Sequence, residues 1–274
     1  MNYEKLEFDI VRWLKDYYYM YALDSFVVGV SGGIDSAVTS TLCAKTELPV
    51  HAVGMPLYQD PTQENLSDRH LEWLSLNYPN VRKHKFDLSD TFDSFLDTMT
   101  PQFTSKHAEA NSRSRVRMIT LYQIAACQGG VVVGTGNKVE DYGVGFYTKY
   151  GDGGVDIAPI ADLYKTQVWG LGEYMGVQED IVNAEPTDGL WDDKRTDESQ
   201  LGVSYEQLEW VMESGIVEGA KQSGTSVNEL DMWRGKLITE EQRAAIVQYD
   251  KFNTMNKHKM LPIPTFKLEK DYVQ

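Results

Sequence analysis

The sequence is poor in cysteine and contains no long apolar run. Its two cysteines, Cys43 and Cys127, are too few for a disulfide framework or a four-cysteine metal site, which is typical of proteins from a reducing compartment. No stretch approaches the roughly 18 consecutive apolar residues of a membrane span, and the charged segment Met1–Lys5 does not resemble a signal peptide. We therefore expect a cytoplasmic protein without a membrane-spanning segment.

Basic residues are scarce as well. The chain has 26 Lys and Arg residues against 41 Asp and Glu residues, which gives a formal net charge of −15. Such a chain repels nucleic acid and anionic membrane surfaces at long range, because non-specific binding to either depends on a basic field. An anionic ligand must be held by a local cluster of cations and by metal, so we expect small molecules as partners, and neither nucleic acid nor a membrane.

The composition is otherwise that of a globular protein, with 42% hydrophobic and 24% charged residues. A length of 274 residues suits a single domain that spans residues 1–274. Apolar residues recur at helical spacing from Tyr3 to Tyr21, which predicts an amphipathic first helix. Two polar segments, Asp97–Ser112 and Glu185–Gly202, are expected to be irregular. They are candidates for loops that close over a ligand, although surface loops without such a role are commoner.

Apolar runs alternate with helical stretches in the pattern of a parallel sheet. Helical patterns at 68–76 and 112–128 separate the runs expected as strands, which are 26–30, 50–55, 81–86 and 131–134. This order predicts an α/β fold in which a doubly wound parallel sheet is flanked by helices and binds its ligands at the carboxyl ends of the strands.

A glycine-rich turn, Ser31–Ser36, follows the first expected strand and opens a helix. Adjacent glycines let backbone N–H groups approach an anion, and the helix N-terminus adds a favourable dipole. The turn lacks the lysine of the common nucleotide loop and carries an acid, Asp35. An acid beside phosphates indicates a bridging Mg²⁺. The alternative is an ordinary strand-turn-helix in which Asp35 caps the helix.

A second small-residue turn follows the run 131–134 and carries Glu140, which would let Asp35 and Glu140 hold one metal from two sides. The next loop is rich in glycine and contains Lys149, so its backbone can wrap closely around a ligand. Lys165 falls at an expected helix start, where the dipole disfavours a cation, and this indicates a phosphate partner. Taken singly, each lysine could equally be a solvated surface charge.

Together these residues resemble the ammonia-dependent NAD synthetases, a family of N-type ATP pyrophosphatases, from about Trp13 to Phe266. The most specific motif is Thr-Lys-Tyr-Gly-Asp-Gly-Gly at 148–154. Further matching stretches are Arg113–Met118, Gly134–Thr135, Glu185–Thr187, Leu201–Tyr205 and His258–Lys259. The resemblance implies a Rossmann-like fold of the adenine nucleotide alpha hydrolase type.

The resemblance also implies a reaction in two steps. The nicotinate carboxylate of deamido-NAD attacks the α-phosphate of ATP and releases pyrophosphate, and ammonia then displaces AMP from the acyl adenylate. Adenylation supplies a good leaving group, so no protein nucleophile is needed. ATP is the co-substrate and Mg²⁺ the implied cofactor. Ammonia is the expected nitrogen donor, because Cys43 and Cys127 suit no glutaminase arrangement.

Site residues follow from the family's motifs as expectations. The implied ATP site comprises Gly29, Val30, Ser31, Gly32, Gly33, Ile34, Asp35, Ser36, Thr135, Lys165 and Thr187. The implied catalytic groups are Ser31, Asp35, Ser36 and Lys165, and the implied Mg²⁺ ligands are Asp35 and Glu140. The implied deamido-NAD contacts are Tyr17, Arg115, Lys149, Asp156, His258 and Lys259. The first helix would form a homodimer interface, and the C-terminal tail would bind substrate.

Two departures from the family pattern and two alternatives remain open. One extra residue lies between Glu140 and Lys149, which makes Asp141 a rival metal ligand, and the segment after Thr187 also differs. The first alternative is another adenylating amidotransferase or thiolase that shares only the phosphate loop; a tRNA-thiolating enzyme would have a basic face and cysteine pairs. The second is a nucleotide-binding module without catalysis.

Overall fold

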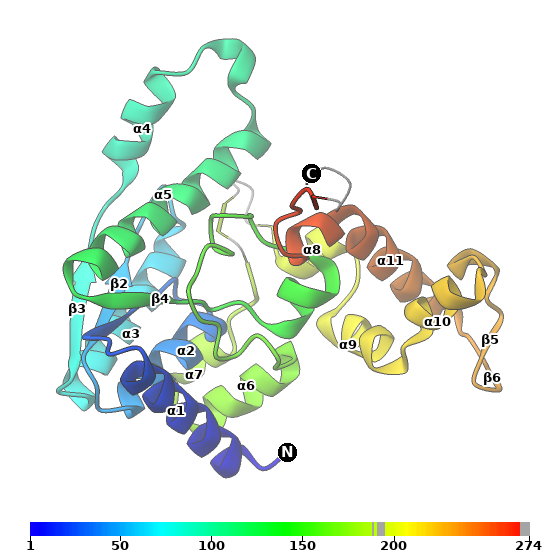
Figure 1. The fold of residues 1–274 in the computed structure, drawn as a ribbon, viewed down its shortest axis with the longest axis horizontal. Helices are drawn as coiled ribbons and strands as arrows, with labels where there is room; N and C mark the ends of the chain where they lie inside the picture. Colours follow the sequence, from blue (N-terminus) through cyan, green and yellow to red (C-terminus); the bar gives the residue numbers. More distant parts are fainter. Residues whose placement is uncertain (188, 191–194, 269–274) are drawn as a thin grey trace.

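A computed structural model describes residues 1–187, 189–190 and 195–268. Its centre is a parallel four-stranded sheet of order β3-β2-β1-β4 (Figure 1). The strands are β1 (Ser25–Gly29), β2 (Val50–Gly54), β3 (Val81–Lys85) and β4 (Gly130–Val133). The chain runs outward from β1 to β3 and then returns to the other side of β1, which confirms the doubly wound α/β fold.

Helices cover both faces of the sheet. One face packs against α1 (Tyr3–Met20), α2 (Ile34–Lys45), α3 (Pro61–Asn77), α6 (Lys165–Tyr174) and α7 (Glu179–Val182). The other packs against α4 (Ser89–Asp97) and α5 (Lys106–Cys127). Phe26 and Val28 of β1 therefore contact the first helical layer and Val27 the second, which explains why the run Phe26–Val28 is apolar.

The edge strand β3 differs from the expectation drawn from its apolar pattern. Only Val81 is buried in it, and Arg82, Lys83 and Lys85 are exposed. Charged side chains on an edge strand discourage pairing with another chain. The strand itself is confirmed, but as a charged edge and not as a buried element.

The segment expected to be irregular at 97–112 is largely helical, so that expectation is wrong for residues 106–112. Helix α5 begins at Lys106 because the Ser105 hydroxyl accepts a hydrogen bond from the Ala108 N–H at 3.2 Å. The α4–α5 hairpin projects from the body of the molecule (Figure 1). The early start of α5 adds Asn111 to its face, and this residue contributes to the site.

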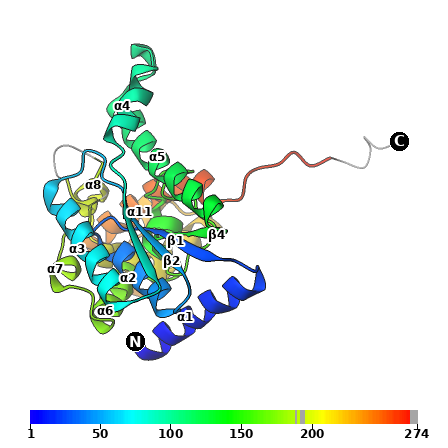
Figure 2. The same ribbon diagram turned by 90° about the vertical axis from the view of Figure 1, so that its left-hand side faces the viewer.

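The C-terminal part forms a second apolar cluster that includes Leu208, Ile216 and Tyr249. Its elements are α8 (Asp197–Leu201), α9 (Tyr205–Ser214), α10 (Ile216–Ser223), β5 (Met232–Trp233), β6 (Lys236–Leu237) and α11 (Glu240–Met260). Helix α8 is a short ordered element within the segment 185–202, of which positions 188 and 191–194 lie outside the described residues. Residues 261–268 leave α11 as an exposed extended segment that points away from the body (Figure 2).

Within the described residues, no helix combines the length and the apolar character that crossing a bilayer requires. Both cysteines are free thiols; Cys43 is buried in α2 and Cys127 is exposed at the end of α5.

Candidate active site

A cleft of about 820 Å³ lies at the carboxyl ends of β1, β2 and β4. The turns that follow these strands line it, together with α5, the glycine-rich loop, the start of α6 and the end of α11. This is the position that a doubly wound sheet predicts, because its strand ends and helix N-termini converge there.

The turn Ser31–Ser36 is held in shape by its own hydroxyl groups. The Ser36 hydroxyl accepts from the Ser31 N–H at 3.1 Å and donates to the Gly33 carbonyl at 2.9 Å. Gly32 has a φ of +93°, and a Cβ there would lie 2.6 Å from the backbone oxygen of Gln63 in α3. Only glycine fits at that position, so the sequence of the turn is dictated partly by the helix packed behind it.

Asp35 does not cap α2, so the ordinary strand-turn-helix alternative fails at this residue. The N-cap of α2 is Gly33, without a side-chain hydrogen bond. The Asp35 carboxylate instead bonds the Lys165 ammonium at 2.6 Å and accepts from the Asn137 amide at 3.2 Å. Its side chain is therefore turned toward the turn after β4, as a shared site requires.

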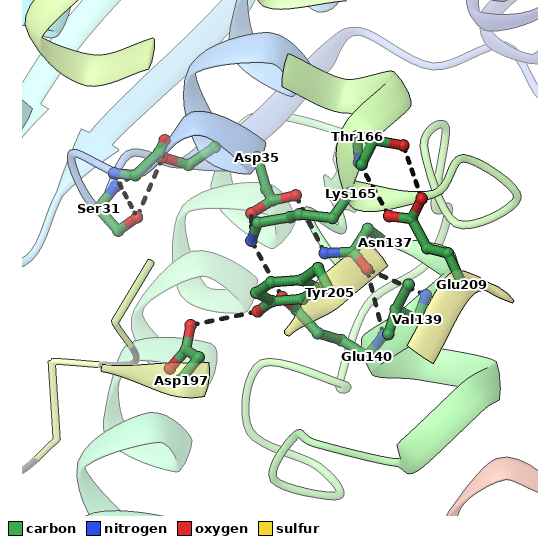
Figure 3. Close-up of polar contacts among 12 residues, drawn as sticks. Ser31, Asp35, Asn137, Val139, Glu140, Lys165, Thr166, Asp197, Tyr205 and Glu209 are labelled. Atoms are coloured by element: carbon green, nitrogen blue, oxygen red, sulfur yellow. Dashed lines mark hydrogen bonds and ion pairs between the residues drawn. The ribbon is translucent and has the colours of Figure 1, made fainter. Parts of the chain in front are cut away.

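Lys165 is the first residue of α6, which confirms the expected helix start. Its side chain is only 3% exposed and lies between two carboxylates, bonding Glu140 at 3.0 Å as well as Asp35 (Figure 3). The ring of Tyr205 lies 4.8 Å from the ammonium, and the Tyr205 hydroxyl donates to Glu140 at 2.6 Å. The cluster thus joins the turns after β1 and β4 with α6 and α9.

The electrostatics of this cluster are set by burial and by one cation. Burial opposes the charge of Lys165, but Asp35 and Glu140 outweigh it and raise the pKa of the ammonium above its usual value. Burial raises the pKa of Asp35, although Lys165 opposes that rise. For Glu140 burial acts the same way, yet Lys165, Tyr205 and Asn137 outweigh it and lower the pKa. Lys165 is therefore fully charged and Glu140 is ionised at neutral pH.

Glu140 stands at the start of a π-helix, Val139–Val144. The fully buried Asn137 holds this start, because its side-chain oxygen accepts from the N–H groups of Val139 at 3.0 Å and Glu140 at 3.2 Å. The backbone hydrogen bonds of a π-helix span one residue more than those of an α-helix, and such turns often occur at functional sites. The extra residue noted between Glu140 and Lys149 lies in the stretch that contains this wider turn.

Asp141, the rival metal ligand, has a different environment. Its carboxylate lies against Gly136, where a Cβ would be 2.3 Å from either carboxylate oxygen. Burial, aided by Glu140, Asp152 and Asp35, raises the pKa of Asp141 to about 8. Glu140 is therefore the acid that shares the Lys165 ammonium with Asp35, while Asp141 lines the cleft beside it.

The glycine-rich loop is fixed to α5 by Asp152. Its carboxylate accepts from the Ser114 hydroxyl at 2.6 Å and from the Thr148 N–H at 3.0 Å, and the Thr148 hydroxyl donates to Asn111 at 2.7 Å. Gly151 is required here because a Cβ would lie 2.3 Å from the Ser114 hydroxyl oxygen. The motif Thr-Lys-Tyr-Gly-Asp-Gly-Gly therefore forms a loop that packs closely against α5.

Four of the predicted deamido-NAD contacts come together around this loop. The Arg115 guanidinium donates to the Lys149 carbonyl at 3.3 Å, and the Lys149 ammonium donates to the His258 carbonyl at 3.3 Å. Lys259 donates to the Tyr147 carbonyl at 2.7 Å. All four of Arg115, Lys149, His258 and Lys259 line the cleft, and the guanidinium of Arg115 and the ammonium groups of Lys149 and Lys259 supply the local cations that a chain of net charge −15 needs for an anionic ligand.

The predicted ATP residues also line the cleft, with one exception. The lining residues are Gly29, Val30, Ser31, Gly33, Ile34, Asp35, Ser36, Thr135, Lys165 and Thr187. Among the described residues the cleft lining does not include Gly32, Tyr17 or Asp156. Tyr17 packs between Trp13 and Tyr21 on α1. Asp156 accepts from the Val132 N–H at 2.7 Å and from the Tyr122 hydroxyl at 3.0 Å, which anchors its loop to β4 and α5.

Sequence reasoning missed Asn137, Tyr205 and Arg117. Arg117 is half-buried in the cleft wall, where its guanidinium donates to the Met55 carbonyl at 3.0 Å, and desolvation lowers its pKa to about 10. Tyr205 and Arg117 lie in stretches that match the family, Leu201–Tyr205 and Arg113–Met118, but the sequence did not show which residues they contact. Asn137 carried no distinguishing signal, because the turn that contains it also has the polar residues Thr135 and Lys138.

The fold and this site define a doubly wound α/β protein with a glycine-rich turn after β1 and with acidic and basic groups that meet across the strand ends. A family model described as NAD synthase matches residues 7–260, and the chain belongs to the NAD synthase family. This confirms the family that the sequence motifs indicated.

Individual relatives agree with this assignment. An NH(3)-dependent NAD(+) synthetase from Methanosarcina acetivorans is 34% identical over 254 residues, which cover 89% of this chain and 96% of that protein. One from Finegoldia magna is 37% identical over 211 residues, covering 76% and 84%. The structure of NMN synthetase from Francisella tularensis matches with a TM-score of 0.80 at 29% identity, covering 98% of this chain and 100% of that one. An NH3-dependent NAD synthetase from Campylobacter jejuni, with a TM-score of 0.72 at 22% identity over 97% and 100%, supports the fold.

Proposed function

We infer that the chain is a ligase that amidates deamido-NAD with ammonia, at the cost of ATP, to give NAD, AMP and pyrophosphate. The observation that carries this inference is the Lys165 ammonium held between Asp35 and Glu140, beside the Ser31–Ser36 turn. A module that only senses ATP has no need of a buried cation and two acids at the phosphate loop. The family assignment favours the NAD synthetase reaction over that of other adenylating amidotransferases.

In this proposal ATP lies with its phosphates along the Ser31–Ser36 turn, near Thr135, Lys165 and Thr187. The carboxylates of Asp35 and Glu140 lie together beside the Lys165 ammonium and offer hard oxygen ligands, so these two residues would hold Mg²⁺ next to that ammonium. Bound there, Mg²⁺ would neutralise charge on the pyrophosphate. The residues of the chain orient the triphosphate: N–H groups and hydroxyls of the turn bind it, and Lys165 supplies a fixed positive charge.

The nicotinate half of the acceptor substrate is placed against the glycine-rich loop. Arg115, Lys149 and Lys259 would bind its phosphates, because they gather positive charge at one side of the cleft, and His258 would contact the substrate beside them. The carboxylate oxygen then attacks the α-phosphorus of ATP while the bond to pyrophosphate breaks. Ammonia attacks the acyl carbon, AMP leaves, and the nitrogen loses a proton. Tyr17 and Asp156 remain predicted contacts of deamido-NAD, although neither lines the cleft of its own chain.

A second acceptor, nicotinate mononucleotide, is favoured by one observation. The structure matched with a TM-score of 0.80 over 98% of this chain is that of an NMN synthetase. The two acceptors share the nicotinate, ribose and phosphate that would lie at the glycine-rich loop, so the same cleft and the same two steps would serve both. They differ only in the adenylate half.

A product assay distinguishes these candidates. We expect purified protein with ATP, Mg²⁺ and ammonium to convert deamido-NAD to NAD, with release of one pyrophosphate per turnover. Higher kcat/KM with nicotinate mononucleotide would assign the second function. Glutamine freed of ammonia should support no turnover, and at a fixed subsaturating ammonium concentration the rate should rise with pH, since only unprotonated ammonia attacks. Pyrophosphate release with neither acceptor would contradict both functions.

We further propose that the chain acts as a single-domain homodimer in the cytoplasm, with small molecules and not nucleic acid or membranes as ligands. Helix α1 supports the dimer, because Phe8 and Trp13 are 62% and 44% exposed on it and Tyr21, which follows its last residue, is 58% exposed. Sedimentation at micromolar concentration should give twice the mass of one chain, and Trp13→Glu should shift it to one chain. A fully active wild-type monomer would contradict this proposal.

A further inference from the structure

Helix α9 reaches from the C-terminal cluster to the first turn of α6, where Lys165 lies. Two of its residues, Tyr205 and Glu209, stand four positions apart and so share one helix face. Tyr205 contacts Lys165 and Glu140, as described above. Glu209 has no contact with the ammonium in the described structure, yet it is buried, with only 8% of its surface exposed.

Glu209 binds the residue next to Lys165. One carboxylate oxygen accepts from the Thr166 N–H at 3.0 Å, and the other accepts from the Thr166 hydroxyl at 2.6 Å (Figure 3). A buried carboxylate carries a desolvation cost, which raises the pKa of Glu209, and these bonds from Thr166 offset it. The two bonds fix the backbone of Thr166 in both position and direction.

The location at the N-terminus of α6 explains why an acid serves there. The first N–H groups of a helix have no partner within the helix, and the dipole favours a negative charge beside them. Lys165 places a positive charge at this same N-terminus of α6, which the helix dipole disfavours. Glu209 therefore stabilises the helix start that the functional lysine destabilises.

We propose that Glu209 is a positioning residue that acts through Thr166 to hold the Lys165 ammonium in register with the ATP phosphates. This inference rests on the function proposed above for the same site. Its consequence is specific: loss of Glu209 should impair the use of ATP, while the binding of the acceptor substrate, which lies on the other side of the cleft, should be unchanged.

Steady-state kinetics of Glu209→Ala test the proposal, with KM determined separately for ATP and for the acceptor. We expect kcat/KM for ATP to fall between about tenfold and a hundredfold, the range for misplacement of a catalytic group by a distant change. The KM for the acceptor should stay within about twofold of wild type. Glu209→Gln keeps an acceptor for the Thr166 N–H, so it should recover most of the loss. Glu206→Ala, which removes an exposed acid from the same helix, is the matched control and should resemble wild type.

An equal rise in the KM for ATP and the KM for the acceptor would overturn the proposal. Wild-type kcat/KM for ATP in Glu209→Ala would overturn it as well. If Glu209→Ala does not fold, as judged by circular dichroism, Thr166→Val gives the same test by removing one of the two bonds, with a smaller loss confined to ATP. The dissociation constant of ATP measured by calorimetry separates this inference from the proposed reaction. Inactive wild-type protein whose ATP affinity still depends on Glu209 would refute the reaction alone.

Discussion

Lys165→Ala is expected to lower kcat/KM for ATP by about a hundredfold and to destabilise the folded protein by about 3–5 kcal/mol. The side chains of Asp35 and Glu140 are only 15% and 16% exposed, and both bond the Lys165 ammonium. Its removal leaves two adjacent acids without that cation, and an unpaired buried charge is more costly than the pair was worth. Pyrophosphate release and urea unfolding measure the two effects.

The stability of this variant should depend on pH in a direction that the electrostatics dictate. In the wild type burial raises the pKa of Asp35, Lys165 opposes the rise, and Glu140 adds to it. Without Lys165 the pKa rises further, so the folded state binds a proton that the unfolded state releases. The loss of stability should therefore be largest at neutral pH and shrink as the pH falls through that raised pKa.

A second lysine provides the control. Lys138 lies in the turn that precedes Glu140, and its ammonium pairs at 2.8 Å with Asp162, whose side chain is 93% exposed. Such surface pairs contribute about 0–1 kcal/mol. Lys138→Ala should leave both measurements close to wild type. Near-normal pyrophosphate release by Lys165→Ala would contradict the assignment of Lys165 to the ATP site.

Asp35→Asn and Glu140→Gln should each reduce pyrophosphate release by about a hundredfold or more while the protein stays folded. Each change replaces a carboxylate with an amide of nearly the same size, so one hard anionic ligand is lost but the other acid still pairs with Lys165. The rate should be measured over a range of Mg²⁺ concentrations, because a lost ligand shifts the Mg²⁺ requirement upward. Pyrophosphate release at wild-type rates in both variants would contradict the metal assignment.

Asp141→Asn is the matched control for the position of the second ligand. Its carboxylate lies against Gly136 and its pKa is raised to about 8. An amide of the same size should therefore be tolerated with a small effect on the Mg²⁺ requirement. Loss of pyrophosphate release in Asp141→Asn, with normal release in Glu140→Gln, would identify Asp141 and not Glu140 as the second Mg²⁺ ligand.

Local signals in the sequence determined the strands and the turns that end them. Helices cover both faces of β1, and the apolar run that this requires can be read without knowing which helices they are. The glycine-rich turn after β1 is also visible in the sequence, although the need for Gly32 comes from α3 packed behind it. The start of α6 at Lys165 was also predictable. The motif at 148–154 identified the family, since a loop that lies against a helix through Gly151 and Asp152 tolerates few substitutions.

Only the tertiary structure decided which residues surround Lys165. Lys165 meets Asp35 across 130 positions of the chain and Glu140 across 25, and Glu209 reaches Thr166 across 43. These contacts depend on how α6 and α9 pack against the strand ends, which neither periodicity nor a short motif encodes. For the same reason the sequence did not show the contacts of two other residues. The Asp156 carboxylate anchors β4, and Asn137 joins Asp35 to the start of the π-helix. The sequence alone was enough to predict many of the chemical groups that lie near the cleft, whereas the packing of the helices determines which of them contact one another.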